Sequence, residues 1–519
     1  MAFTELEHSS YLDLTSYRGN APLPTPTGLD TSFSFNVALV LERANDPTAL
    51  LASDWASRQA QLETLKSNNT LWSTYGADLA AYQQVRTELT HMGFSLFPEG
   101  NDSQYVSSAE SRTIWLTVDQ SNFATLFGSV LHKGKDEQGS DVSFWLDNLS
   151  LPDNLISHGV KGVFFDTGFP PVLAGDPRVA GVELPQGGQS PGNSLPRVDM
   201  LYPNELAAIY NYPFNSDTTR DWWKSVATAT IGLIEPNLGT AVPAPLHKTF
   251  QQLADEYRAS IPDVGLDTHG TYVNVAPGGA KNDNSGERSL DVSIATAVSP
   301  TSSLVLYAGS GNTQGARSLV FTAYQAAVWD ETNNPHVVSS SFRDYPHMAP
   351  GSPFAFAYNE LYIDAVLRNI TMVNAVGDGG SGDQFGNGLT NVDTMHASAY
   401  SIVAGGASLS SQQAAADDPT LQAIAAAATA GSLPAIWTLV EGGLKHLPST
   451  DTLATNERLI ETVWNSYFVY GKAITDQYKN GGGFLQNFAA AGGVDPSQPQ
   501  PSYQTDFGLH LATSDPSAL

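Results

Sequence analysis

From the start of the chain to about Asp176, the spacing of apolar residues changes repeatedly between the two-residue period of a strand and the period of a helix. Phe35–Arg43 has the pattern of a strand, and Ser111–Leu131 predicts a strand followed by a helix. Trp55–Leu65 and Gly76–Phe94 carry apolar residues at helical spacing. This mixture of short strands and amphipathic helices predicts a compact α+β domain.

A second pattern follows, in which short apolar runs alternate with longer amphipathic segments. Such alternation predicts an α/β fold built on a doubly wound parallel sheet. In these sheets, functional residues collect beyond the carboxyl ends of the strands. The predicted strands are Val226–Pro236, Thr271–Ala276, Ser303–Gly309, His336–Phe342 and Ile370–Asp378, and the predicted helices are Leu246–Ser260, Gly286–Ser299, Ala316–Trp329 and Pro353–Asn369.

One segment rich in Gly, Pro and Ser, Leu184–Arg197, separates the two patterns and is the best linker candidate. It divides the chain into domains at 1–183 and 198–519, with an Ala-rich insertion at about 410–456 in the second. Gly188–Gly192 within the linker fits the G-x-S-x-G nucleophile elbow. That elbow needs a strand before it and a helix after it, so a linker position argues against a Ser-His-Asp hydrolase.

Charge and composition exclude several classes of protein. The chain of 519 residues has 24 Lys and Arg against 52 Asp and Glu, a net charge of −28, which disfavours nucleic acid and anionic membranes as partners. Such acidity suits a protein that works in acid, and it equally suits simple solubility. The chain has no cysteine, so disulfides and thiol catalysis are excluded. We see no signal peptide and no apolar stretch long enough to span a membrane.

The predicted helix at Gly286–Ser299 carries two carboxylates four residues apart, Glu287 and Asp291. At helical spacing they fall on the same face as the apolar residues Leu290, Ile294 and Val298. Carboxylates on a core face are costly unless they are paired, and a close pair can share a proton. The alternative is a frayed helix end with both groups in water.

Asp378 directly follows an apolar strand and opens a glycine-rich loop, Val376–Gly380. A protonated carboxyl at the carboxyl edge of a sheet can donate a hydrogen bond to a developing oxyanion. The alternative is an ordinary turn aspartate, which glycine-rich loops favour.

Together these features resemble the sedolisin family of serine-carboxyl peptidases, over nearly the whole chain. The first domain resembles the family propeptide, and Met200–Pro213 resembles the start of the mature enzyme. The further matching segments, in chain order, are Glu287 and Asp291 for the E-x-x-x-D pair, Val337–Asp344 for the substrate-cleft strand, Val376–Gly380 for the S-G-D-x-G loop, Ala399–Ser408 for a later strand, Glu461–Asn465 for E-x-x-W-N, and 481–504 for G-G-G-x-S…P-x-Y-Q.

The resemblance implies a subtilisin-like catalytic domain at 198–519, preceded by a propeptide at 1–183. It implies that Glu287 acts as general base and then general acid, that Asp291 orients Glu287, and that Asp378 stabilises the oxyanion. It also implies a protein or peptide substrate and secretion, or another acidic extracytoplasmic compartment. The residues expected to bind the substrate are Ser339, Ser340, Ser341, Phe342 and Gly377.

Three departures from the family pattern stand out. Val376 replaces the family serine, and Phe342-Arg343 replaces an aromatic-Gly pair, which leaves the specificity of the cleft open. No Gly-Thr-Ser occurs anywhere, although the family nucleophile should follow Tyr503-Gln504. We therefore expect the serine on a missing or separate C-terminal piece, which would be a partner and would also carry the calcium site. The alternative is a non-catalytic relative that acts as a binding or scaffold protein.

Overall fold

The first unit of the fold is built on an antiparallel sheet in the order β4-β5-β3-β9. The computed structural model describes residues 2–15, 23–101, 105–135, 141–166, 172–173, 210, 228–236, 272–275, 286–299, 301–310, 320–343, 348–377, 395–411, 423, 459–463, 490 and 500–506. The sheet strands are Ser95–Leu96 (β4), Thr113–Asp119 (β5), Ser34–Leu41 (β3) and Val160–Asp166 (β9).

Helices and smaller sheets complete this N-terminal unit. Asp54 and Asp78 cap α3 and α5 by accepting hydrogen bonds from backbone N–H groups three residues on, which explains where both helices begin. The remaining elements are β1 (Phe3–Glu5), α1 (Tyr11–Thr15), β2 (Gly28–Leu29), α2 (Thr48–Leu51), α3 (Trp55–Ser67), α4 (Leu71–Tyr75), α5 (Leu79–His91), α6 (Phe123–Phe127), β6 (His132–Lys135), β7 (Asp141–Phe144), β8 (Ser150–Pro152) and α7 (Asp153–Ser157).

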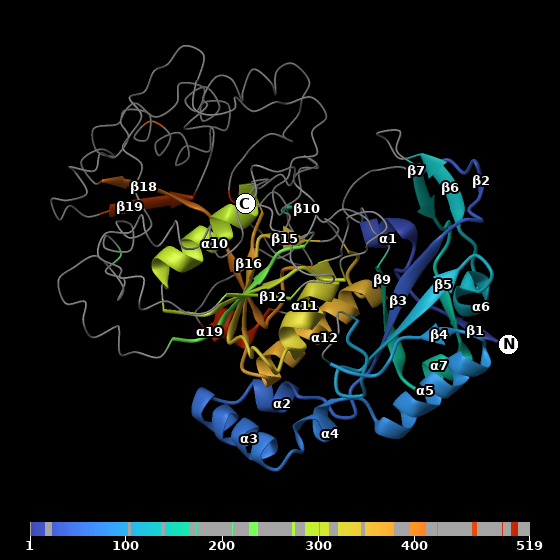
Figure 1. The fold of residues 1–519 in the computed structure, drawn as a ribbon, viewed down its shortest axis with the longest axis horizontal. Helices are drawn as coiled ribbons and strands as arrows, with labels where there is room; N and C mark the ends of the chain where they lie inside the picture. Colours follow the sequence, from blue (N-terminus) through green and yellow to red (C-terminus); the bar gives the residue numbers. More distant parts are fainter. Residues whose placement is uncertain are drawn as a thin grey trace.

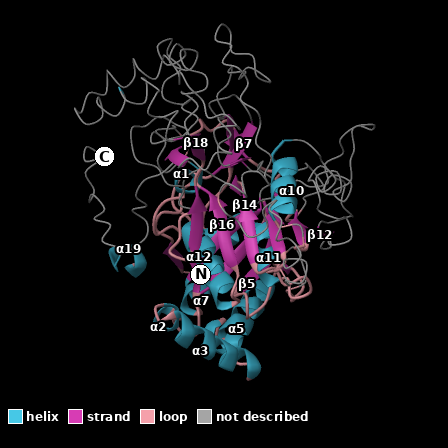
Figure 2. Ribbon diagram, turned by 90° about the vertical axis from the view of Figure 1, so that its left-hand side faces the viewer, coloured by secondary structure: helices cyan, strands magenta, loops and turns pink. Residues whose placement is uncertain are grey.

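The second unit contains the parallel sheet that the alternating pattern predicted. Six strands pair in the order β12-β13-β11-β14-β16-β17, and each neighbouring pair is parallel. Figure 2 shows β14 and β16 side by side in this sheet. The strands are Ile231–Ile234 (β11), Tyr272–Val275 (β12), Leu304–Tyr307 (β13), Val337–Ser340 (β14), Thr371–Ala375 (β16) and Ser401–Ala404 (β17).

Helices cover both faces of this sheet. Gly286–Val298 (α10) lies on one face, whereas Val320–Trp329 (α11) and Pro353–Leu367 (α12) lie on the other (Figure 1). The doubly wound arrangement predicted from the sequence is therefore confirmed for the described residues. The remaining elements of this half are β10 (Val172–Leu173), β15 (Phe342–Arg343), β18 (Ala407–Ser411), β19 (Leu459–Val463) and α19 (Ser502–Asp506).

The α11 and α12 helices form a layer between the parallel sheet and the antiparallel sheet of the N-terminal unit (Figure 1). Every residue of α11 is buried. Phe164 of β9 stacks on Phe321 of α11, with ring centroids 4.5 Å apart, and meets Tyr358 of α12 edge-on at 5.3 Å. One hydrophobic core thus extends across both units.

A buried cluster of four charges joins the same two units. Arg43 and Arg112 of the N-terminal unit both bind Glu360 and Asp364 of α12, with N–O distances between 2.6 and 2.8 Å. The side chains of Arg112 and Asp364 are each only 1% exposed. Buried charges of this kind require a fixed geometry, so the cluster favours one relative placement of the two units.

The orientation of α10 differs from the prediction. Leu290 and Ile294, expected on the core face, are 54% and 48% exposed. The buried face instead carries Val292, Ser293 and Thr296. Two residues of this packed face, Ser293 and Thr296, are polar, so hydrophobic periodicity does not identify the face as buried. The predicted core face of α10 was therefore wrong.

Several predicted features lie outside the described residues. They include the linker Leu184–Arg197, the helix Leu246–Ser260 and most of the insertion at 410–456. Within the described part of the chain, none of the helices has the length and apolar character needed to cross a bilayer.

Candidate functional site

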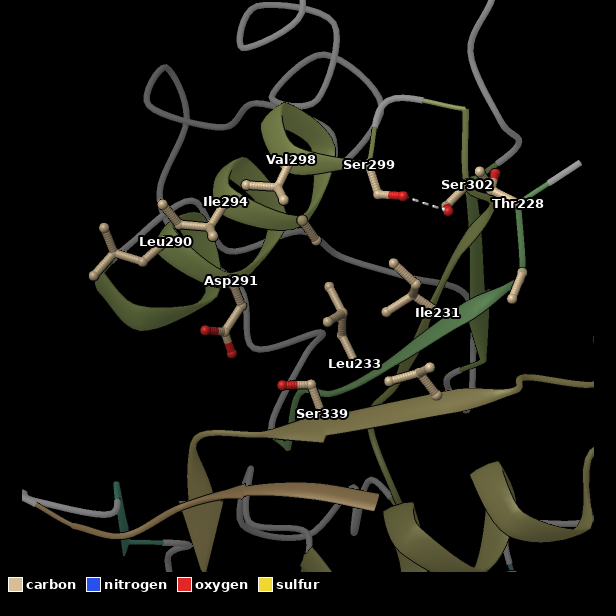
Figure 3. A pocket seen from close by; sticks show the side chains of 13 residues that line it. Thr228, Ile231, Leu233, Leu290, Asp291, Ile294, Val298, Ser299, Ser302 and Ser339 are labelled. Atoms are coloured by element: carbon tan, nitrogen blue, oxygen red, sulfur yellow. Dashed lines mark hydrogen bonds between the residues drawn. The ribbon is translucent and has the colours of Figure 1, made fainter. Parts of the chain in front are cut away.

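Asp291 projects from α10 toward the carboxyl end of β14. Its Oδ1 accepts a hydrogen bond of 3.1 Å from the hydroxyl of Ser341, the residue that follows β14. Figure 3 shows the carboxylate of Asp291 pointing from the helix toward the strand that carries Ser339. Asp291 therefore lies at the sheet edge where α/β proteins place their chemistry.

The other two predicted carboxylates are only partly accounted for. Glu287 belongs to the first turn of α10, four residues before Asp291, as the helix prediction required. Asp378 lies outside the described residues, which end in this region at Gly377. Gly377 is buried and has a φ of 97°, a backbone conformation that glycine adopts readily.

The predicted substrate-binding residues after β14 have different environments. Ser339 lines a pocket, and Ser341 bonds Asp291. Ser340 is buried, and its hydroxyl donates to the Phe342 carbonyl oxygen at 2.9 Å and accepts from the Phe342 N–H at 3.2 Å. Ser340 thereby fixes the turn, so the side chains that face α10 are those of Ser339 and Ser341.

A short strand from an earlier part of the chain pairs with this segment. Val172–Leu173 (β10) runs antiparallel to Phe342–Arg343 (β15), in a register that places Val172 opposite Arg343. Two residues near the end of the predicted first domain, 1–183, thus form a strand on the segment predicted to bind the substrate.

Glu235 is a site residue that the sequence analysis missed. It follows β11, and its side chain is fully buried. Ile231 and Leu233 line the pocket under α10, and side chains alternate along a strand, so Glu235 faces α10 as well. Ile234 pairs with Ser340, so Glu235 lies beside Ser341. An acid directly after an apolar strand, the signal used for Asp378, could have identified it.

A pocket of about 730 Å³ separates α10 from β11 and β14 (Figure 3). Its lining is mainly apolar, with Asp291 and Ser339 at one end and Ser299 and Ser302 at the other. The exposed residues Leu290 and Ile294 belong to this lining, so the predicted apolar stripe faces the pocket. A mostly apolar hollow with few polar groups is the usual form of a ligand or segment binding site.

Metal binding finds no support in the described part of the chain. Within those residues, no group of three or more His, Asp or Glu side chains is arranged to hold a metal ion. The calcium site expected from the resemblance was assigned to a segment beyond this chain, so the expectation stays a prediction.

The described residues thus form an α/β protein with a carboxylate site at the carboxyl edge of its parallel sheet. The chain is 34% identical over 134 residues to kumamolisin from Bacillus sp. (strain MN-32). This match covers 26% of the chain and 23% of kumamolisin. It supports similarity to a sedolisin-type peptidase, and the chain matches about a quarter of that relative's length.

A solved structure, Pseudomonas sedolisin (serine-carboxyl proteinase) complexed with two molecules of pseudo-iodotyrostatin, aligns with 60% of this chain and 67% of that chain. The identity is 15% and the TM-score 0.35, a likeness too small to carry an argument about fold. No protein-family model matches the chain. The fold therefore rests on the strand order described above.

Proposed function

We propose that this chain is part of an acid-acting serine-carboxyl endopeptidase of the sedolisin type. The observation that carries the proposal is the position of Asp291, one turn after Glu287 on α10 and bonded to Ser341 at the carboxyl edge of the sheet. The similarity to kumamolisin supports the same class of activity. The N-terminal unit, residues 1–183, would be a propeptide, and residues 198–519 the main part of a subtilisin-like catalytic domain.

Each carboxyl group would have a distinct role. Glu287 would take the proton from a serine hydroxyl as that oxygen attacks the peptide carbonyl, and would then give it to the leaving amine. Asp291 would orient Glu287, with Ser341 holding Asp291 in place. Asp378, protonated, would donate a hydrogen bond to the oxyanion. Glu235, buried on the same sheet face, would add a third carboxyl group to the pair formed by Glu287 and Asp291.

The nucleophile would come from a second segment. No Gly-Thr-Ser occurs among the 519 residues, so we propose that the serine lies on a C-terminal piece of the same precursor. A base and an oxyanion donor activate a nucleophile but do not replace one. The calcium site would belong to that piece, and no step described here uses the ion.

The strand pairing at Phe342–Arg343 supports a peptide as the substrate. An extended peptide binds well where it can add a strand to an exposed backbone edge. Val172–Leu173 already pairs in this way, so in the precursor a substrate would compete with the chain itself. The net charge of −28 is consistent with work in an acidic compartment outside the cytoplasm.

The absence of a Gly-Thr-Ser supports one alternative, a non-catalytic relative that binds peptides or serves as a scaffold. The peptidase proposal predicts that the complete protein hydrolyses peptide bonds, whereas the alternative predicts binding without hydrolysis. The test is hydrolysis of a denatured protein in acid by the purified chain, with and without the C-terminal segment that carries Gly-Thr-Ser.

We expect hydrolysis only when both pieces are present. Glu287→Gln should then lower kcat by about 10² to 10⁴, the usual contribution of a general acid–base group. Asp141→Asn, which removes one negative charge at a side chain that is 89% exposed, is the matched control and should have full activity. Peptide binding without turnover by the combined pieces would favour the scaffold. Hydrolysis by the chain alone, abolished by Glu287→Gln, would mean that another residue is the nucleophile.

A further inference from the structure

His396 lies fully buried between the segment after β14 and the end of β16. Its Nδ1 is 2.7 Å from the carbonyl oxygen of Ala375, the last residue of β16. Its Nε2 is 3.0 Å from the carbonyl oxygen of Phe342. One imidazole ring therefore spans two backbone segments at the carboxyl edge of the sheet.

Both of these carbonyl oxygens can only accept a hydrogen bond. A neutral imidazole has one N–H donor and one nitrogen lone pair, so it would turn that lone pair toward one of the carbonyl oxygens. Only the doubly protonated ring donates to both Ala375 and Phe342. The two short distances thus match the imidazolium form, which histidine adopts in acid.

The surroundings of His396 fix its position. Its own carbonyl oxygen accepts a 2.6 Å hydrogen bond from Ser401. On α12, the hydroxyl of Tyr362 donates to the Met395 carbonyl oxygen at 2.9 Å, and on α11 the hydroxyl of Tyr324 donates to Asn374 at 2.6 Å.

The ionisable side chains on the described elements near the ring include Tyr362 of α12, Tyr324 of α11 and, through its bond to Ser341, Asp291 of α10.

The two acceptors belong to the segments to which the proposed function assigns substrate binding and the oxyanion loop. Phe342 follows Ser341, which bonds Asp291, and its strand is the one paired by Val172–Leu173. Ala375 lies two residues before Gly377, at the start of the loop that leads to Asp378. A link between these carbonyl groups sets the distance between the peptide-binding strand and the oxyanion loop.

We propose that His396 is a positioning residue that, when doubly protonated, ties the Phe342 strand to the end of β16. Loss of one proton breaks one of the two hydrogen bonds and loosens this edge of the site. The Phe342 strand and the end of β16 are then ordered relative to each other in acid and less ordered near neutral pH. The consequence for peptide binding rests on the proposed function, whereas the ring's protonation and the ordering do not.

The first test is ¹⁵N NMR of the full chain labelled at histidine, recorded across the pH range. We expect the His396 signals to report a proton on both ring nitrogens in acid and loss of one proton as the pH rises. A ring that stays in one neutral tautomer down to the pH of unfolding would overturn the proposal. This measurement needs no catalytic activity, so it stands apart from the test of peptidase function.

The second test is amide hydrogen exchange in His396→Gln, compared with the natural chain at the same pH. Glutamine offers one donor group and one acceptor and does not titrate. In acid we expect exchange in the segments around 342–343 and 375–377 to be about tenfold faster in the variant, the effect of losing one hydrogen bond from a charged donor. Near neutral pH the two proteins should converge.

His91→Gln is the matched control, because His91 is exposed on α5 of the N-terminal unit. It should match the natural chain at every pH. If His396→Gln speeds amide exchange by the same factor at all pH values, the residue has a merely structural role, and the proposed dependence on protonation is overturned. If the exchange results hold while Glu287→Gln leaves hydrolysis unchanged, the proposed function fails and the role of His396 stands.

Discussion

Phe164 offers the sharpest test of how the two units are joined. Its side chain is fully buried on β9 and contacts rings of α11 and α12. Phe164→Ala removes the stacked contact with Phe321 and leaves a cavity in the layer between the sheets. Truncating a buried Phe to Ala costs about 3–5 kcal/mol in unfolding free energy, and the lost ring pair accounts for about 0.5–1.5 kcal/mol of this.

The matched control is Phe127→Ala. Phe127 is also fully buried, but its ring contacts are Phe123 and Phe165 inside the N-terminal unit. Both variants should lose similar stability in urea unfolding. Only Phe164→Ala should speed amide exchange in α11 and α12, because only that variant opens the layer they share with β9.

Two results would refute this reasoning. Equal loss of protection in α11 and α12 in both variants would mean that the two units open as one block. Unchanged protection in Phe164→Ala would mean that the buried charge cluster joins the units without help from the aromatic rings. A double variant with Phe321→Ala would then measure the coupling of the ring pair directly.

Three further outcomes test other parts of the structure. A side chain at Gly162 would meet a carbon of α12 at 2.9 Å. Gly162→Ala should therefore lower the free energy of unfolding by about 1–3 kcal/mol through overpacking, seen as a lower urea midpoint, and an unchanged midpoint would contradict the close approach. Trp115→Phe should cost about 1–3 kcal/mol in the same assay, since it leaves the Oε1 of Gln325 without its 2.9 Å donor; a neutral effect would count against that bond. Hydrogen bonds from Ser121 lower the pKa of Asp119. The contribution of Asp119 to stability is therefore fully present above pH 3.8 and is lost as the pH falls through the lowered pKa. Asp119→Asn should remove this part of the acid dependence of unfolding, and a pH profile identical to that of the natural chain would contradict the prediction.

The alternation of apolar runs and amphipathic segments predicted the parallel sheet and its helices well, because both periods are strong in this half of the chain. It could not show that α11 lies between two sheets. The segment Val320–Trp329 carries apolar residues around most of its circumference, with Thr322 and Gln325 among them, which indicates burial but does not identify the neighbours.

The site was harder to predict than the fold. The stripe of Leu290 and Ile294 was assigned to the core, whereas the packed face of α10 carries Ser293 and Thr296. Hydroxyl residues can pack well when they are hydrogen-bonded locally, as Ser293 is to the Leu290 carbonyl, and hydropathy gives no sign of this. His396 could not be anticipated either, because its two acceptors come from residues 54 and 21 positions away.

The four-charge cluster has a consequence for the two units once they are apart. Cleavage between them would uncover the outer face of α11 and α12, which is rich in aromatic rings and would otherwise invite aggregation. Glu360 and Asp364 lie on that same face, and Arg43 and Arg112 would leave with the N-terminal unit. Each separated surface would then carry unpaired charges of one sign. Copies of the same piece would repel each other, so the charges buried in the joined protein would keep its parts soluble after separation.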